Sequence, residues 1–129
     1  MELIEGSSID PDIIQQVRRH ADGVELVLVS LDSSHTYEHV LAELNAYVDL
    51  VSLGSFCIVF DTALEDLPAG SFPDRPSDVG NSPKTAVHEW LRTHPELEID
   101  KDIDNKLLIS VAPDGCLNRI VTRSGVKTI

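Results

Sequence analysis

Two aspartates, Asp32 and Asp61, each follow an apolar run. The first run, Val24 to Leu31, is rich in valine and leucine with little polar alternation. This pattern is typical of a strand that is buried on both faces of a parallel sheet. The second run, Gly54 to Phe60, has the same character. Because ligands of open α/β sheets bind beyond the carboxyl ends of the strands, we expect both carboxylates on one rim. Their oxygen atoms suit a hard divalent cation such as Mg²⁺.

The composition fits one globular domain and excludes two classes of partner. The chain has 129 residues, of which 42% are hydrophobic and 25% are charged. The formal net charge of −12 argues against nucleic acid and against an anionic membrane surface. No transmembrane segment is expected, because no apolar run approaches about 20 residues, and the N-terminus lacks a basic-then-apolar signal. We therefore expect a cytoplasmic protein, with Cys57 and Cys116 as buried free thiols.

Strands and helices are expected to alternate along the first half of the chain. A strand at 1–4 leads to a helix at 11–21 that Asp10 or Ser8 caps and Gly23 closes. The strand at 24–31 is followed by a helix that Thr36 caps, and then by the strand at 54–61. This β-α-β-α-β order predicts a parallel sheet with right-handed crossovers. The expected buried stripe of the second helix comprises Val40, Leu41, Leu44, Tyr47, Val48 and Val51.

The second half of the chain begins with a loop. Residues 62–82 hold several prolines and glycines and leave directly from Asp61, which favours a lid or binding loop. Ser82 and Pro83 begin a helix that ends before Pro95, and a weak strand is expected at 97–99. The turn signal at 113–115 predicts an antiparallel hairpin between strands at 107–112 and 116–121. Residues 122–129 are expected to form a flexible tail.

Several stretches resemble the family that groups cephalosporin hydroxylase with rhamnosyl O-methyltransferase. The matching runs cover most of the chain in order: Ile4 to Ser8, Val29 to Leu44, Ile58 to Thr62, Phe72 to Pro76, Asn81 to Val87 and Asp104 to Gly115. The resemblance implies a class I S-adenosylmethionine-dependent methyltransferase fold. That fold is α/β and Rossmann-like, with a mostly parallel sheet and helices on both faces. The resemblance also implies S-adenosylmethionine and Mg²⁺ as cofactors and a small hydroxylated substrate.

In that fold, a Gly-rich loop after the first strand and an acid after the second hold the methyl donor. Neither feature is found in this sequence. The strand at 1–4 would correspond to the third strand of the family fold. We therefore expect residues 1–129 to form a single, N-terminally truncated domain that lacks the first two strands. Strand edges exposed in this way would favour a homo-oligomer.

The resemblance also assigns roles to residues of the rim. Asp32 and Asp61 match metal ligands, whereas Phe60 stands where cephalosporin hydroxylase carries an acid, so weaker metal binding is expected. His35 lies three residues after Asp32, where the related catechol-type methyltransferases have a lysine base. A histidine ordinarily titrates near neutral pH, so His35 is a candidate general base.

Four small residues are candidates for binding the donor. Gly6, Ser7 and Ser8 form the loop that borders the adenine of the donor in the family fold, and Ser33 lies beside Asp32. Glycine and serine also permit an ordinary strand-to-helix loop.

Other interpretations of these residues stay open. Asp32 and Asp61 could cap helices, and Asp32, His35 and His39 have the spacing of an iron site with two histidines and one carboxylate. Three functions remain at this point. The first is O-methyl transfer to a sugar or another small hydroxylated molecule. The second is hydroxylation of a β-lactam nucleus. The third is an incomplete domain or assembly module without catalysis.

Overall fold

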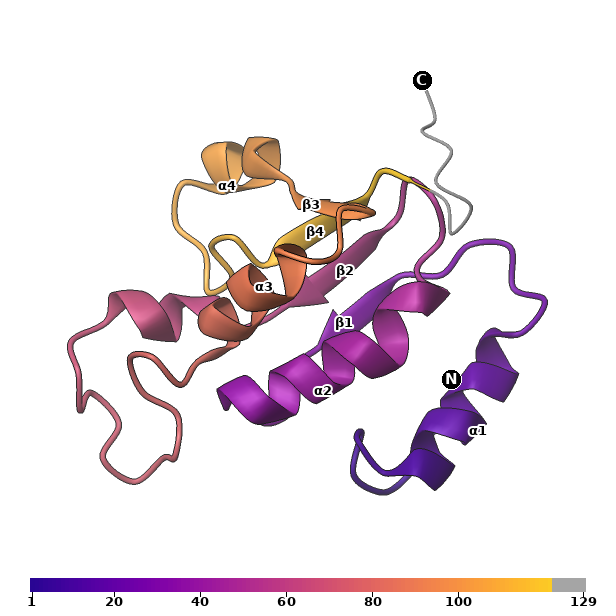
Figure 1. Ribbon diagram of the computed structural model, residues 1–129, viewed down its shortest axis with the longest axis horizontal. Coiled ribbons are helices and arrows are strands. Elements are labelled where there is room, and N and C mark those ends of the chain that lie inside the picture. The colour runs from indigo at the N-terminus through magenta and orange to yellow at the C-terminus, as the bar shows by residue number, and fades with distance from the viewer. Residues whose placement is uncertain (122–129) are drawn as a thin grey trace.

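A four-stranded sheet forms the centre of the molecule in the computed structural model, which describes residues 1–121 (Figure 1). The strands are β1 (Val29–Leu31), β2 (Phe56–Val59), β3 (Leu97–Ile99) and β4 (Cys116–Arg119). Their order is β1-β2-β4-β3; β1 and β2 are parallel, and β4 is antiparallel to both β2 and β3. β1, β2 and β3 therefore run in one direction and β4 runs in the other. The prediction of an α/β protein is confirmed, with a mixed sheet.

The helices begin at residues that cap them. The α-helices are α1 (Pro11–Ala21), α2 (Tyr37–Tyr47), α3 (Pro83–Leu91) and α4 (Lys101–Leu107), and two short 3₁₀ helices are η1 (Val48–Leu50) and η2 (Thr62–Asp66). Asp10 accepts a hydrogen bond from the backbone of α1, and Thr36 accepts one from the backbone of α2. Ser82 and Thr85 form a capping box at the start of α3. These three predicted helix starts are confirmed.

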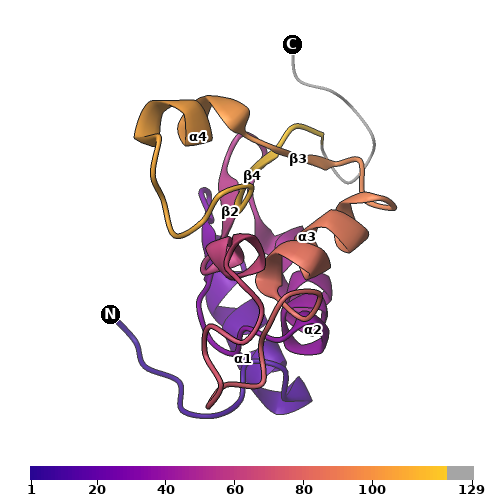
Figure 2. The ribbon, with the colours of Figure 1, turned by 90° about the vertical axis from the view of Figure 1, so that its left-hand side faces the viewer.

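Helices α2 and α3 lie side by side over one face of the sheet (Figure 1 and Figure 2). The buried cluster beneath them joins Leu31, Cys57, Val59, Leu97 and Leu117 of the strands to helix residues that include Leu44, Val87 and Trp90. Leu44 and Leu117 are fully buried, and each such side chain contributes about 2 kcal/mol by leaving water. This layer fixes how β1 and β2 end beside each other, which in turn positions Asp32 and Asp61.

The opposite face of the sheet is less covered. The strand register places on it two rows of side chains: Ser30, Ile58 and Cys116 in one row, and Phe56, Asn118 and Glu98 in the next. None of these six residues is buried. Helices were predicted on both faces, but among residues 1–121 a buried helical layer is present on one face only.

One predicted strand is absent, and a second is shorter than predicted. Residues 1–4 form no strand, and the strand expected at 24–31 is reduced to Val29–Leu31. Leu26 and Leu28 are 71% and 53% exposed, so they do not form the doubly buried strand that their sequence suggested. The physical reason is the position of this segment at the edge of the sheet. β1 is the edge of the described sheet, and extended backbone needs a partner strand to satisfy its N–H and C=O groups.

The predicted hairpin at 107–112 and 116–121 is also wrong. Lys101–Leu107 is α4, which Asp100 caps through the backbone N–H groups of Asp102 and Ile103. Residues 108–112 are irregular, and β4 pairs with β2 and β3 instead. The apolar run after Lys106 is mostly exposed, so its hydrophobicity was a misleading signal for a strand. The expected tail at 122–129 lies outside the described residues.

None of the helices within residues 1–121 has the length and apolar character that crossing a membrane requires.

Candidate functional site

Asp32, His35 and Asp61 come together at one end of the parallel strand pair. Asp32 directly follows β1, and Asp61 lies two residues after β2, whose last residue pairs with Leu31. One possible ligand atom from each of the three side chains lies within 4.8 Å of the others. His35 Nε2 is 3.1 Å from Asp61 Oδ2. The expected rim of carboxylates is therefore present, and His35 belongs to it.

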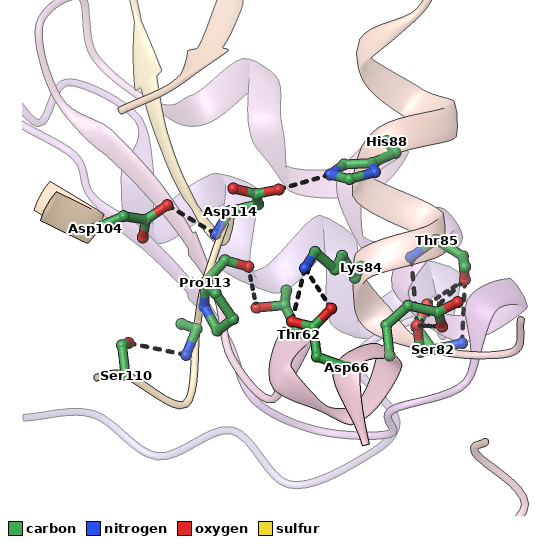
Figure 3. Close-up of polar contacts among 12 residues, drawn as sticks. Thr62, Asp66, Ser82, Lys84, Thr85, His88, Asp104, Ser110, Pro113 and Asp114 are labelled. Atoms are coloured by element: carbon green, nitrogen blue, oxygen red, sulfur yellow. Dashed lines mark hydrogen bonds and ion pairs between the residues drawn. The ribbon is translucent and has the colours of Figure 1, made fainter. Parts of the chain in front are cut away.

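The backbone at Asp61 turns sharply from β2 into η2. Its φ of 56° lies in the left-handed region, which costs about 1 kcal/mol for a residue with a side chain but is tolerated by aspartate. Phe60 N–H donates to the carbonyl of Leu31, which extends the strand pairing to the residue before the turn. On the other side, Thr62 Oγ1 donates to the carbonyl of Pro113 at 2.6 Å (Figure 3). Asp61 is thus fixed from both directions.

A polar network supports η2 and the turn at 113–115 (Figure 3). Lys84 of α3 forms an ion pair with Asp66 at the end of η2. Asp114 in the turn contacts Lys101 of α4 and His88 of α3. Burial by itself raises the pKa of Asp114, but the contacts with Lys101 and His88 outweigh burial and lower its pKa overall. The network therefore joins two helices to the turn that supports Asp61.

His39 does not join Asp32 and His35. Its Nε2 lies 3.0 Å from the hydroxyl oxygens of Ser8 and Ser33 and 3.6 Å from Glu43 Oε1. The imidazole of His39 is therefore engaged in a separate polar cluster at the start of α2. The iron-type pattern that the spacing of Asp32, His35 and His39 suggested is not formed.

A cavity of about 490 Å³ lies between α1, β1 and α2. Gly6, Ser8 and Ser33 line it, so the structure gathers three of the four residues that were expected to touch the donor. Ser7 is exposed and contributes its carbonyl, which accepts a hydrogen bond from Asp10. Gly6 has a φ of 146°, which strains any residue with a side chain, and a Cβ there would lie 2.7 Å from Ile13 Cδ1 and would displace that side chain.

Two residues of this cavity, Glu43 and Tyr47, were not identified as functional from the sequence. Glu43 is buried and accepts hydrogen bonds from Ser8 and Ser33, and the Tyr47 hydroxyl donates to the carbonyl of Ser8. A sequence signal for Glu43 does exist. It lies three residues after Val40 and four before Tyr47, which places it on the buried stripe of α2.

The segment expected to be a lid has an ordered beginning and end. Residues 62–66 form η2, and Glu65 accepts hydrogen bonds from Gly80 N–H and the Ser82 hydroxyl. Asn81 accepts a hydrogen bond from Tyr37 N–H, which attaches the end of the segment to the start of α2. Residues 66–76 between these points are exposed and project from the end of the sheet that carries Asp61 (Figure 1). A lid function stays a prediction for this exposed part.

The possible ligand atoms at the rim suit a divalent cation. Two carboxylates supply the oxygen ligands that Mg²⁺ prefers, whereas an imidazole ligand would favour metals such as Mn²⁺ or Zn²⁺. Phe60, beside Asp61, adds no ligand atom. Whether His35 acts as a ligand or as a base therefore decides which cation the rim favours.

Comparisons with known proteins give a consistent match. The family model described as "Rhamnosyl O-methyltransferase/CmcI" matches residues 1–120. Proteins named "Rhamnosyl O-methyltransferase" from Mycobacterium bovis and Mycobacterium tuberculosis are each 31% identical to this chain over 119 residues. These matches cover 91% of this chain and 46% of each relative, so the chain spans about half the length of the curated relatives it matches. No solved structure matches the chain.

Proposed function

The chain belongs to the rhamnosyl O-methyltransferase/CmcI family, and from this premise we propose that it serves S-adenosylmethionine-dependent methyl transfer to a hydroxyl group. The proposed acceptor is a sugar or another small hydroxylated molecule. The observation that carries the proposal is the cluster of Asp32, His35 and Asp61 at the carboxyl ends of two parallel strands. In an open α/β sheet this is where ligands bind.

The proposal includes a finer description of the fold. The four strands would be part of a Rossmann-like class I methyltransferase sheet, which has one antiparallel strand. The direction of β4, opposite to that of β1, β2 and β3, supports this description. The open edge of β1 is then the place where further strands of such a sheet would pair.

In the proposed reaction the three rim residues have different tasks. Asp32 and Asp61 would hold Mg²⁺, and a bound divalent cation lowers the pKa of a hydroxyl group that it contacts. His35 would accept the proton of the acceptor hydroxyl as the hydroxyl oxygen forms a bond to the methyl carbon. The bond between that carbon and the sulfonium sulfur of the donor would break in the same step, with S-adenosylhomocysteine as the leaving group. The Asp61 carboxylate, 3.1 Å from Nε2 of His35, would hold the imidazole ring at the rim.

The donor would lie in the adjoining cavity. Gly6 allows close approach of the backbone, and the hydroxyl groups of Ser8 and Ser33 face the same space. Ser7 would contribute only through its backbone. Because Asp32 lines both the cavity and the rim, a donor in the cavity would lie beside the metal and the acceptor hydroxyl.

Calorimetric titration with MgCl₂ tests the metal site. We expect weak binding by the wild-type chain and a loss of affinity of at least about tenfold in Asp32→Asn and in Asp61→Asn, since ligand charge sets the affinity for hard cations. Phe60→Glu should strengthen binding, because it adds a carboxylate beside Asp61. Asp74→Asn is the matched control, because Asp74 is an exposed aspartate in the loop and should leave affinity unchanged.

His35→Gln separates the two possible tasks of His35. A base contributes no ligand atom, so the affinity for Mg²⁺ should change less than about twofold. A large loss of metal affinity in this variant would make His35 a ligand instead. If the wild-type chain and Phe60→Glu both bind no divalent cation, the proposed metal site is wrong.

A further inference from the structure

A cluster of four polar side chains, of which one is buried and Ser33 is exposed, lies next to the rim that carries Asp32 and His35. At its centre is Glu43 of α2, which is only 2% exposed. Ser8 and Ser33 each donate a hydroxyl hydrogen bond to Glu43 Oε1 at 2.6 Å. His39, one turn earlier on α2, places its Nε2 3.0 Å from both hydroxyl oxygens. One carboxylate oxygen therefore joins two loops that lie 25 residues apart in the sequence.

Stability alone does not explain a carboxylate in this place. The second oxygen, Glu43 Oε2, is buried and has no hydrogen-bond partner within residues 1–121. A buried polar oxygen without a hydrogen-bond partner costs free energy, so this oxygen subtracts from the stability that the contacts of Oε1 provide. An unsatisfied oxygen that the chain nevertheless carries at this position points to a task in the site.

The contacts of Glu43 identify this task. Ser33 follows Asp32 and precedes His35 by two residues, so a fixed Ser33 hydroxyl restrains the whole 32–36 loop. Ser8 anchors the other side of the cluster, and the Tyr47 hydroxyl holds the Ser8 carbonyl in addition. Within the described residues, Glu43 and His39 are the side chains of α2 that hydrogen-bond both the loop at 5–8 and the loop at 32–36.

We propose that Glu43, supported by His39, is a positioning residue: it holds Ser33, and through Ser33 it keeps Asp32 and His35 aligned with Asp61. This inference rests on the proposed function in one respect: the alignment of Asp32 and His35 with Asp61 has a purpose only where the rim binds a metal. The position of the 32–36 loop itself does not depend on that function and can be measured without metal.

Glu43→Met tests the inference, because methionine has a similar volume and removes the acceptor. We expect affinity for Mg²⁺ to fall at least tenfold while the urea midpoint of unfolding falls only modestly, because Ser33 is exposed and its hydroxyl can hydrogen-bond water instead. Glu43→Gln keeps one acceptor oxygen and should recover most of the affinity. Ser33→Ala removes the same link without changing charge and should weaken binding to a similar extent. Glu38→Met, an exposed acid on the same helix, is the control and should change neither quantity.

Hydrogen exchange in the absence of metal gives the second measurement. The amides of residues 33–36 should exchange at least tenfold faster in Glu43→Met and Ser33→Ala, with the amides of β2 unchanged. If the wild-type chain binds no Mg²⁺ but this local acceleration is found, the proposed function fails and the positioning role stands. Unchanged exchange at 33–36, or equal acceleration of all amides together with a lower urea midpoint, would overturn the inference. If Glu43→Met does not fold, Ser33→Ala decides the outcome by the same two measurements.

Discussion

Asp114 combines an unusual backbone conformation with two ionic contacts. Its φ of 63° is left-handed, and its backbone N–H donates to Asp104 at 3.0 Å. Its carboxylate contacts His88 (Figure 3), and it also contacts Lys101. The side chains of Lys101 and His88 are 61% and 50% exposed, so this pairing contributes only about 0.5–1 kcal/mol to stability. The contribution nevertheless depends on pH in a direction that can be worked out.

The pKa of Asp114 is lowered from its ordinary value of 3.8 despite burial, so the folded chain binds this proton less readily than the unfolded chain. The stability that Asp114 contributes is therefore fully present above 3.8 and is lost as pH falls through the lower, folded pKa. We expect the difference in urea midpoint between wild type and Asp114→Asn to shrink between about pH 5 and pH 2. Asp74→Asn is the control. Parallel pH profiles for wild type and Asp114→Asn would contradict the prediction.

At the scale of elements, the turn at 113–115 determines where β2 ends. Gly115 N–H donates to the Ala112 carbonyl, and the Gly115 carbonyl accepts a hydrogen bond from Val59 N–H at 2.8 Å. A Cβ on Gly115 would lie 2.2 Å from the carbonyl oxygen of Val59, which is a contact that backbone atoms cannot relieve without moving. The close approach of this turn to β2 therefore requires glycine. The contact is made at Val59, which lies two residues before Asp61 in the sequence.

Gly115→Ala should separate the turn from β2. We expect a loss of about 1–3 kcal/mol in the free energy of unfolding, since the added methyl group overlaps backbone. Metal affinity should fall as well, because the end of β2 carries Asp61. Gly70→Ala is a useful comparison: Gly70 has a positive φ but open space around its Cβ position, so it reports the cost of backbone strain alone. Equal urea midpoints for Gly115→Ala and wild type would show that the turn does not support β2.

Local signals in the sequence predicted the helices better than the strands. Asp10, Thr36 and Ser82 each cap a helix through a bond to a backbone N–H two or three residues away, which is a short-range interaction readable from sequence. The strand expected at 1–4 and the hairpin after Leu107 failed because a strand needs a partner that only the whole fold supplies. Apolar runs there remained exposed instead.

The same distinction applies to the candidate site. The proximity of Asp32 and Asp61 could be predicted, because two parallel neighbours end at one edge of a sheet. The contact of His35 with Asp61 depends on how the 32–36 loop folds back, and no spacing rule gives it. Glu43 lies on the buried stripe of α2, but its partners Ser8 and Ser33 come from loops whose conformation the sequence does not reveal.

At the scale of the whole molecule, the described sheet has an open edge next to the cavity. β1 is the edge strand, and the exposed Leu26 and Leu28 precede it. The residues of β1 also line the cavity, which residues of α1 line as well. Helix α1 has no buried residue, and Arg18, which hydrogen-bonds Asp49 and the carbonyl of Ala46, is one of its links to the remaining fold. The cavity is therefore bounded by an element that is weakly packed.

This arrangement leads to a prediction for the 129-residue chain alone, which should bind S-adenosylmethionine poorly and transfer no detectable methyl group. The chain spans 46% of the length of its relatives, and Gly6, Ser8 and Ser33, which we propose as donor contacts, line the cavity. Its sequence contains no pair of glycines close enough to form the Gly-rich loop of the family fold. Each polar group of the donor left without a partner costs about 1–3 kcal/mol, so losing several weakens binding by orders of magnitude.

Calorimetric titration with S-adenosylmethionine provides the measurement, with S-adenosylhomocysteine as a second ligand that lacks the positive charge on sulfur. We expect dissociation constants at least about 100-fold weaker than micromolar for both ligands, because about 2.7 kcal/mol of missing contacts suffices for such a change. Hydrogen exchange should be fast along α1 with and without the ligand, since this helix has no buried residue to protect it. Micromolar binding that slows exchange in α1 would mean that the cavity between α1 and β1 holds the donor without any further strand.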